Sequence, residues 1–134
     1  MPRTGERTKT WIESIIRDFC ASEQNSLHMQ TGEPAWSEPQ IASARGDDPL
    51  FEQVKTDIGP FYWTPLDAFR LAWPDLHATA AELAVIVYVL PQTETTRLDQ
   101  REATQVPAER WARSRSHGEE FNRALRLHLA EQLT

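Results

Sequence analysis

Apolar side chains recur every three or four positions near the beginning of the chain, which is the spacing of a helix with one buried face. They fall between about residues 7 and 22 and comprise Trp11, Ile12, Ile15, Ile16, Phe19 and Cys20. We therefore expect an amphipathic helix over 7–22 that covers an apolar core. Residues 1–6 are polar and are expected to form a loose tail.

Turn-forming residues divide the next third of the chain into short segments. Residues 23–39 are mostly polar and contain Gly32, Pro34 and Pro39, which predicts a long loop. Residues 40–45 predict a short strand, and the Gly-Asp-Asp-Pro run behind it is typical of a turn.

Two short helices are predicted between this turn and Pro74. The first spans 50–58 and should turn four apolar side chains inward. These are Leu50, Phe51, Val54 and Ile58. The second begins with Thr64 as N-cap and Pro65 at the first helical position. Its expected apolar side comprises Leu66, Phe69, Leu71 and Trp73.

Residues 83–90 are apolar at every position, without the alternation of a half-buried strand. This predicts a strand covered on both faces, as in a parallel sheet. Only this strand and 40–45 are convincing, and an isolated pair of strands is barely stable in water. The sequence therefore predicts an α/β, helix-rich single domain over 1–134 with a small, mostly parallel and incomplete sheet.

The remaining residues predict helices. Residues 93–104 are charged and are expected to form a surface helix, and Pro107 opens a further helical turn. Ser116 and Glu119 have the spacing of a capping box. Four apolar residues follow at every fourth position, namely Phe121, Leu125, Leu129 and Leu133. Gly118 leaves open whether 107–133 forms one helix or two, because glycine inside a helix costs about 1 kcal/mol.

Charge and composition narrow the functional classes. The net charge is −6, with −7 on residues 1–96 and +1 on residues 97–134. An acidic body argues against a general nucleic-acid binder. Cys20 is the only cysteine, which excludes an internal disulfide and a cysteine-held iron–sulfur cluster, and it is expected in the core. No signal peptide or membrane span is recognisable, so we expect a cytoplasmic protein without membrane contact.

The clearest candidate site is a cationic run without an acid between residues 110 and 118. It contains Arg110, Arg113, Arg115 and His117. Guanidinium groups suit phosphate or carboxylate, and a helix beginning near Ser116 would add backbone N–H donors. The alternative is a solvated helix face whose cations pair with nearby acids. Those acids would be Glu109, Glu119 and Glu120.

No catalytic constellation or phosphate-binding glycine motif is present. The four histidines are not spaced along the chain as metal ligands usually are, so we expect no metal site. They are His28, His77, His117 and His128. Four tryptophans should be core residues, namely Trp11, Trp63, Trp73 and Trp111. Phe61, Tyr62 and Trp63 are adjacent and cannot all point inward, so core packing and a pocket or partner surface are equally compatible with them.

Three segments together resemble a known family. They are GDDPLFEQVKTDIGPFYWTPLDAF (46–69), AVIVYVLPQTETTRLDQR (84–101) and PAERWARSRSHGEEFNRALRLHL (107–129). In this order they resemble the amino-terminal part of epoxyqueuosine-reductase-like iron–sulfur proteins. The resemblance implies a cobalamin-dependent reductase acting on a tRNA anticodon loop, with electrons supplied by two [4Fe–4S] clusters in a carboxyl-terminal ferredoxin-like part.

By this resemblance, Arg113, Arg115 and Glu119 would lie nearest a cobalamin cofactor, and Arg110 and His117 on a substrate or partner surface. We expect the chain to be the amino-terminal cofactor- or substrate-pocket portion of such an oxidoreductase, working with an iron–sulfur partner domain or chain. Contact with tRNA is implied only by the resemblance. The second hypothesis is a stand-alone interaction or dimerisation module that pairs through its sheet edge and Phe61–Trp63.

Overall fold

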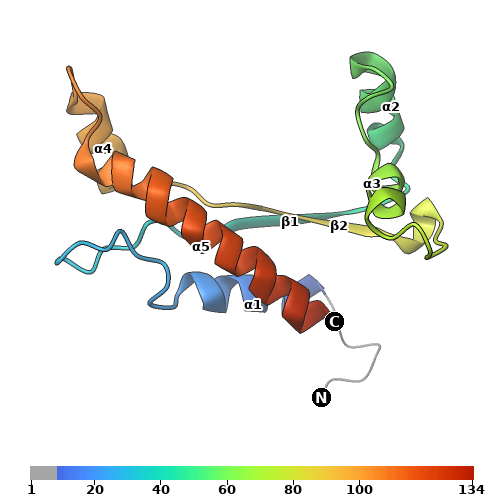
Figure 1. The fold of residues 1–134 in the computed structure, drawn as a ribbon, viewed down its shortest axis with the longest axis horizontal. Helices are drawn as coiled ribbons and strands as arrows, with labels where there is room; N and C mark the ends of the chain where they lie inside the picture. Colours follow the sequence, from blue (N-terminus) through green and yellow to red (C-terminus); the bar gives the residue numbers. More distant parts are fainter. Residues whose placement is uncertain (1–8) are drawn as a thin grey trace. The chain divides into compact units, whose positions relative to one another are not determined.

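The computed structural model describes residues 9–134 and contains five α-helices and two strands in that range (Figure 1). Along the chain these are α1 (Lys9–Cys20), β1 (Gln40–Arg45), α2 (Pro49–Ile58), α3 (Pro65–Ala72), β2 (Ala84–Val89), α4 (Glu94–Glu102) and α5 (Glu109–Leu133). A short 3-10 turn, Ala80–Glu82, precedes β2. The predicted helices and strands are all present, and the predicted tail over 1–6 lies outside the described residues. No helix within 9–134 is long and apolar enough to cross a membrane.

The chain divides into two compact units. One contains the described residues up to Gln40 together with Tyr88–Thr134, and the other spans Ile41–Val87. Among the described residues, all of the buried apolar side chains lie in the first unit, whereas helices α2 and α3 of the second have no buried residue.

Helices α1 and α5 form the core of the first unit (Figure 1). The predicted stripe of α1 is confirmed, because its later apolar residues are buried and face α5. The buried residues of the two helices are Ile15, Ile16, Phe19, Cys20, Phe121, Leu125 and Leu129. Phe19 lies at the centre, with its ring 5.3 Å from that of Phe121 and stacked 4.7 Å from that of His128.

Helix α5 is continuous from Glu109 to Leu133, so the capping box predicted at Ser116 and Glu119 is wrong. Gly118 lies inside this helix and is buried. The indole of Trp36 lies against it and donates a hydrogen bond from Nε1 to the Gly118 carbonyl at 3.2 Å. A methyl carbon on Gly118 would lie 2.8 Å from Trp36 Cε2 and closer still to Cζ2. The glycine is therefore explained by close packing rather than by a helix end.

The second unit is organised by local capping. Asp48 caps α2 by accepting from the backbone N–H of Leu50 at 2.9 Å. The predicted N-cap of α3 is confirmed, since Thr64 and Asp67 form a reciprocal capping box. Lys55 of α2 donates to Asp67 Oδ2 at 2.6 Å and so joins the two helices. Together with the Thr64 backbone N–H, this lowers the pKa of Asp67 to about 2.

The sheet differs from the prediction. β1 and β2 form a two-stranded antiparallel pair, not a parallel sheet, although the chain is helix-rich as expected. β2 is also not covered on both faces, because Val87 and Val89 are about half exposed. A run of apolar residues therefore indicated a strand correctly but not its burial. No third strand pairs with β1 or β2 in residues 9–134.

Several residues predicted to be core are exposed in the second unit. They are Leu50, Ile58, Trp63, Leu71 and Trp73. The physical reason is size, since a unit as short as Ile41–Val87 has too little volume to enclose the apolar sides of two helices and a strand pair. In the first unit Trp11 and Trp111 are partly buried.

We expect Gly118→Ala to destabilise the protein although alanine is the better helix former. The Cβ would lie under 3.0 Å from the Trp36 ring, so we expect an overpacking cost in the upper part of the usual range of about 1–3 kcal/mol. This exceeds the gain of about 1 kcal/mol in helix propensity, and a net loss of up to about 2 kcal/mol should appear in urea unfolding.

Ser116→Ala, at an exposed position of the same helix, serves as the matched control and should change stability by less than about 0.5 kcal/mol. In a Trp36→Leu background the Gly118→Ala loss should shrink. Equal losses in both backgrounds would show that the indole is not the obstacle.

Candidate functional site

Arg110 is bound to two acidic groups from different parts of the first unit. Its guanidinium donates to both carboxylate oxygens of Glu33, at 2.9 and 3.1 Å, and to Asp99 Oδ2 of α4 at 2.6 Å. These bonds raise the pKa of Arg110 and lower the pKa of Glu33, for which Thr31 is the second donor. Arg110 therefore joins α5 and α4 to the loop over residues 23–39, which contains Glu33. Its guanidinium group has no further side free for a ligand.

Arg113 also holds the loop. It donates to Glu109 at 2.9 Å, and its Nη1 reaches the carbonyls of Leu27 at 3.3 Å and His28 at 3.0 Å. Leu27 is fully buried. Arg113 therefore adds hydrogen bonds to a part of the loop that is already held in place by the packing of Leu27.

Arg115 and Glu119, the other two residues assigned to a cofactor by resemblance, are exposed on α5. Neither side chain makes a hydrogen bond or ion pair with another residue of the described chain. The predicted helix start at Ser116 is wrong, as α5 begins at Glu109, and so the backbone N–H groups near Ser116 are inside the helix. The anion site that would combine these amides with the arginines is not formed.

His117 lies beside Glu120, one of the acids expected to pair with the cationic run, and beside His28, which the sequence did not connect with it. Its ring centroid is 4.2 Å from that of His28, and its Nδ1 lies 3.3 Å from Glu120 Oε2. A ligand atom from each of these three residues lies within 4.8 Å of the others. Spacing along the chain could not reveal this cluster, because His28 is in the loop and the other two are on α5.

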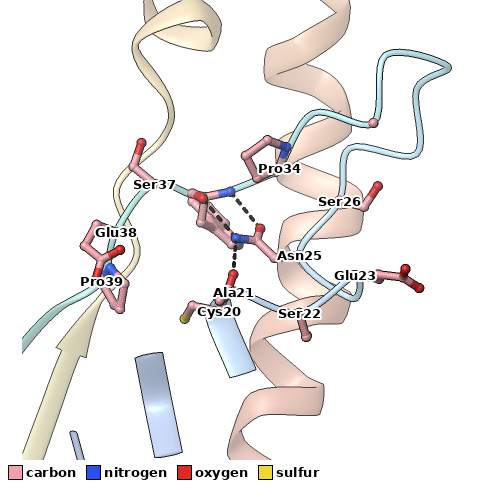
Figure 2. Close-up of a pocket in the computed structure, with 12 residues that line it drawn as sticks. Cys20, Ala21, Ser22, Glu23, Asn25, Ser26, Pro34, Ser37, Glu38 and Pro39 are labelled. Atoms are coloured by element: carbon pink, nitrogen blue, oxygen red, sulfur yellow. Dashed lines mark hydrogen bonds between the residues drawn. The ribbon is translucent and has the colours of Figure 1, made fainter. Parts of the chain in front are cut away.

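A hollow of about 650 Å³ opens beside the loop of the first unit (Figure 2). Asn25 lies at its centre and bonds to the chain on both sides. Its Nδ2 donates to the carbonyls of Cys20 and Trp36, and its Oδ1 accepts from the Trp36 backbone N–H, each at 2.9 Å (Figure 2). The Asn25 amide therefore braces the loop, a role that no local sequence pattern indicates.

Cys20 lines the same hollow but is unsuited to nucleophilic chemistry. It is buried, as predicted. Burial is the main cause, and the nearby Glu38 carboxylate the second, of a thiol pKa raised to about 11, although Arg17 acts in the opposite direction. A thiol with this pKa stays protonated at neutral pH, whereas reactive cysteines need a lowered pKa.

The second unit has an apolar groove of about 550 Å³. Tyr62 and Trp63 line it, together with Phe69 and Trp73 of α3 and the first residues of β2. Phe61 is not part of the lining and is 76% exposed. Of the two interpretations of the aromatic triplet, the exposed surface fits better than core packing.

No family model, curated protein or solved structure matches this chain.

The Arg110–Glu33 pair gives a pH-dependent prediction. Because the pKa of Glu33 is lowered from 4.5 in the folded protein, its contribution to stability is present above pH 4.5 and is lost as pH falls through the folded pKa. Glu33→Gln should therefore lower the urea midpoint at pH 7, and its difference from the wild type should shrink at successively lower pH below 4.5.

Glu23→Gln is the matched control, since Glu23 is exposed and pairs with no cation in residues 9–134. It should leave the midpoint unchanged at pH 7. A Glu33→Gln difference that stays constant down to pH 3 would contradict the ion-pair explanation.

Proposed function

We propose that this chain is a protein-interaction module that pairs with a second copy of itself through the apolar surface of Ile41–Val87. The observation that carries the proposal is the exposure of large apolar side chains in that unit. They are Leu50, Ile58, Phe61, Tyr62, Trp63, Leu71, Trp73, Leu76 and Val87. Monomeric proteins rarely leave large contiguous apolar patches uncovered.

The summed exposed apolar area of this unit is of the same order as the area that one partner buries in a standard interface. The aromatic side chains Phe61, Tyr62, Trp63 and Trp73 are 42–76% exposed. At 150–250 Å² for a buried aromatic side chain, they offer roughly 450 Å². The exposed leucine and isoleucine side chains of the same unit add a comparable amount, and a standard interface buries about 800 Å² on each partner.

Phe61 and the groove favour a second copy over an unrelated protein. Phe61 protrudes, with its ring packed against Gly59, where a methyl carbon would lie 2.6 Å from Phe61 Cε1. The glycine has φ 145°, a conformation that other residues rarely adopt, so the turn specifically permits this ring position. The unit thus carries both an aromatic projection and an apolar groove, and a two-fold axis allows each copy to insert Phe61 into the other.

The edge of β2 supports the same arrangement. β1 is its only hydrogen-bonded neighbour in the described chain, and its sequence AVIVYV has neither charge nor proline. Charged residues and proline are the usual devices that prevent edge strands from pairing. Antiparallel pairing of two β2 strands would give a four-stranded sheet and would place no like charges opposite each other.

Sedimentation equilibrium of the full chain should show a concentration-dependent dimer. Phe61→Ser removes the projection, and Val87→Lys places two ammonium groups near the two-fold axis, so each should weaken the dimer at least tenfold. Val106→Ser and Val106→Lys are matched controls, because Val106 is 74% exposed and lies outside Ile41–Val87. A monomer at all concentrations would rule out the proposal, as would a dimer that neither variant weakens.

A second candidate rests on Arg115 and Glu119. Their exposed side chains on α5 pair with no residue in 9–134, which is compatible with the resemblance to epoxyqueuosine-reductase-like proteins. In this role the chain is the amino-terminal cofactor- or substrate-pocket portion of an oxidoreductase, with an iron–sulfur partner domain or chain carrying the electrons. Cobalamin is the cofactor and tRNA the substrate that the resemblance implies.

Titration of the chain with cobalamin, followed by absorbance, tests this role. Arg115→Ala and Glu119→Gln should each weaken binding at least tenfold, because each removes a charged contact. Arg123→Ala, at another exposed arginine of α5, should not change it. Arg113 is a poor probe because its loss would also release the loop. Equal affinity in all four proteins would exclude these residues from a cofactor site.

A further inference from the structure

We propose that His28, His117 and Glu120 form a binding site for a divalent transition-metal ion, with zinc as the best match. The proposal is independent of dimerisation and of cobalamin binding, since it uses other residues. Two imidazoles and one carboxylate are the ligand set of many zinc sites that keep a fourth position open for water or substrate. Calcium and magnesium prefer ligand sets made of oxygen alone.

The distances suit such an ion with small side-chain rotations. His117 and Glu120 are three residues apart on α5 and therefore share one face of the helix. Their nearest atoms, Nδ1 and Oε2, are 3.3 Å apart. Two ligand atoms at 2.0–2.1 Å from a tetrahedral zinc are roughly 3.3 Å apart, so this edge of the site is already at the required length. His28 comes from the loop over residues 23–39, and all three ligand atoms lie within 4.8 Å of one another.

His28 is held in place by the loop around it. It is the one described non-glycine residue with a positive φ, 55°, a conformation that is uncommon and often found at functional sites. Its backbone N–H donates to Ser26 Oγ at 2.9 Å, and its carbonyl accepts from Arg113 at 3.0 Å. Neighbouring Leu27 is fully buried and donates to the Glu33 carbonyl at 2.9 Å.

The site is accessible to an ion from solvent. His28 is exposed, and the His117 and Glu120 side chains are 28% and 69% accessible. Arg113 contacts the carbonyl of His28 itself, and Glu109 pairs with this arginine at 2.9 Å, which reduces its repulsion of a dication. Three ligands leave one tetrahedral position open for water or an external ligand.

Isothermal titration of the untagged, EDTA-treated full chain with zinc chloride tests the proposal. One equivalent of zinc should bind and should raise the thermal unfolding midpoint. His28→Asn, which keeps a residue tolerant of positive φ, and His117→Gln and Glu120→Gln should each weaken binding at least about tenfold. His77→Gln removes an exposed histidine elsewhere and should leave the affinity unchanged.

Cobalt(II) gives a second measurement that does not depend on the variants' folding. Bound at this site, cobalt should show the intense visible absorption of a tetrahedral complex, and added zinc should remove it. Absence of zinc binding and of the cobalt spectrum would overturn the proposal. Binding that persists in both His28→Asn and His117→Gln, or that is lost in His77→Gln, would overturn it as well.

Discussion

The contact between Trp36 and Gly118 is the constraint on which the first unit depends. Because Gly118 has no side chain, the indole can lie directly on α5 and donate to its backbone. Asn25 then braces the loop by bonding to both the N–H and the carbonyl of Trp36. A loop with little regular secondary structure is thereby held against α5. Arg110 then bonds to Glu33 in this loop, and Arg113 bonds to its backbone carbonyls.

The distance along the chain between contacting residues explains which features the sequence could predict. The helices, the two strands and the Thr64 cap depend on residues close together in the chain, so local patterns were sufficient to locate them. The role of Gly118 depends on Trp36, and the partners of Arg110 lie in the loop and in α4. Such distant pairings carry no local signal. The glycine therefore suggested a helix end, and the arginines suggested either an open cationic surface or pairs with acids of the same helix. The one clue to close packing in the sequence is that Gly118 lies at helical spacing from the apolar residues Phe121 and Leu125.

The strand Ala84–Val89 illustrates a different limit. Its apolar composition specified a strand but not what covers it, because burial depends on the neighbours that the fold supplies. In the described chain only β1 pairs with it, and Val87 remains about half exposed. The aromatic residues before α3 have the same character. These residues have the composition of a protein interior but lie on the surface. Such a surface is consistent with an interface that a second chain completes.

The positive φ of His28 is a conformation that packing alone does not explain. A histidine at positive φ costs free energy, and this exposed side chain recovers little of it by burial. The surrounding bonds can hold the conformation, but they would hold a glycine or asparagine there with less strain. A ring placed 4.2 Å from a second imidazole has a chemical use that those residues lack, since only imidazole adds a nitrogen ligand beside His117 and Glu120. The choice of side chain at this position, rather than the loop conformation alone, is what favours a metal ion.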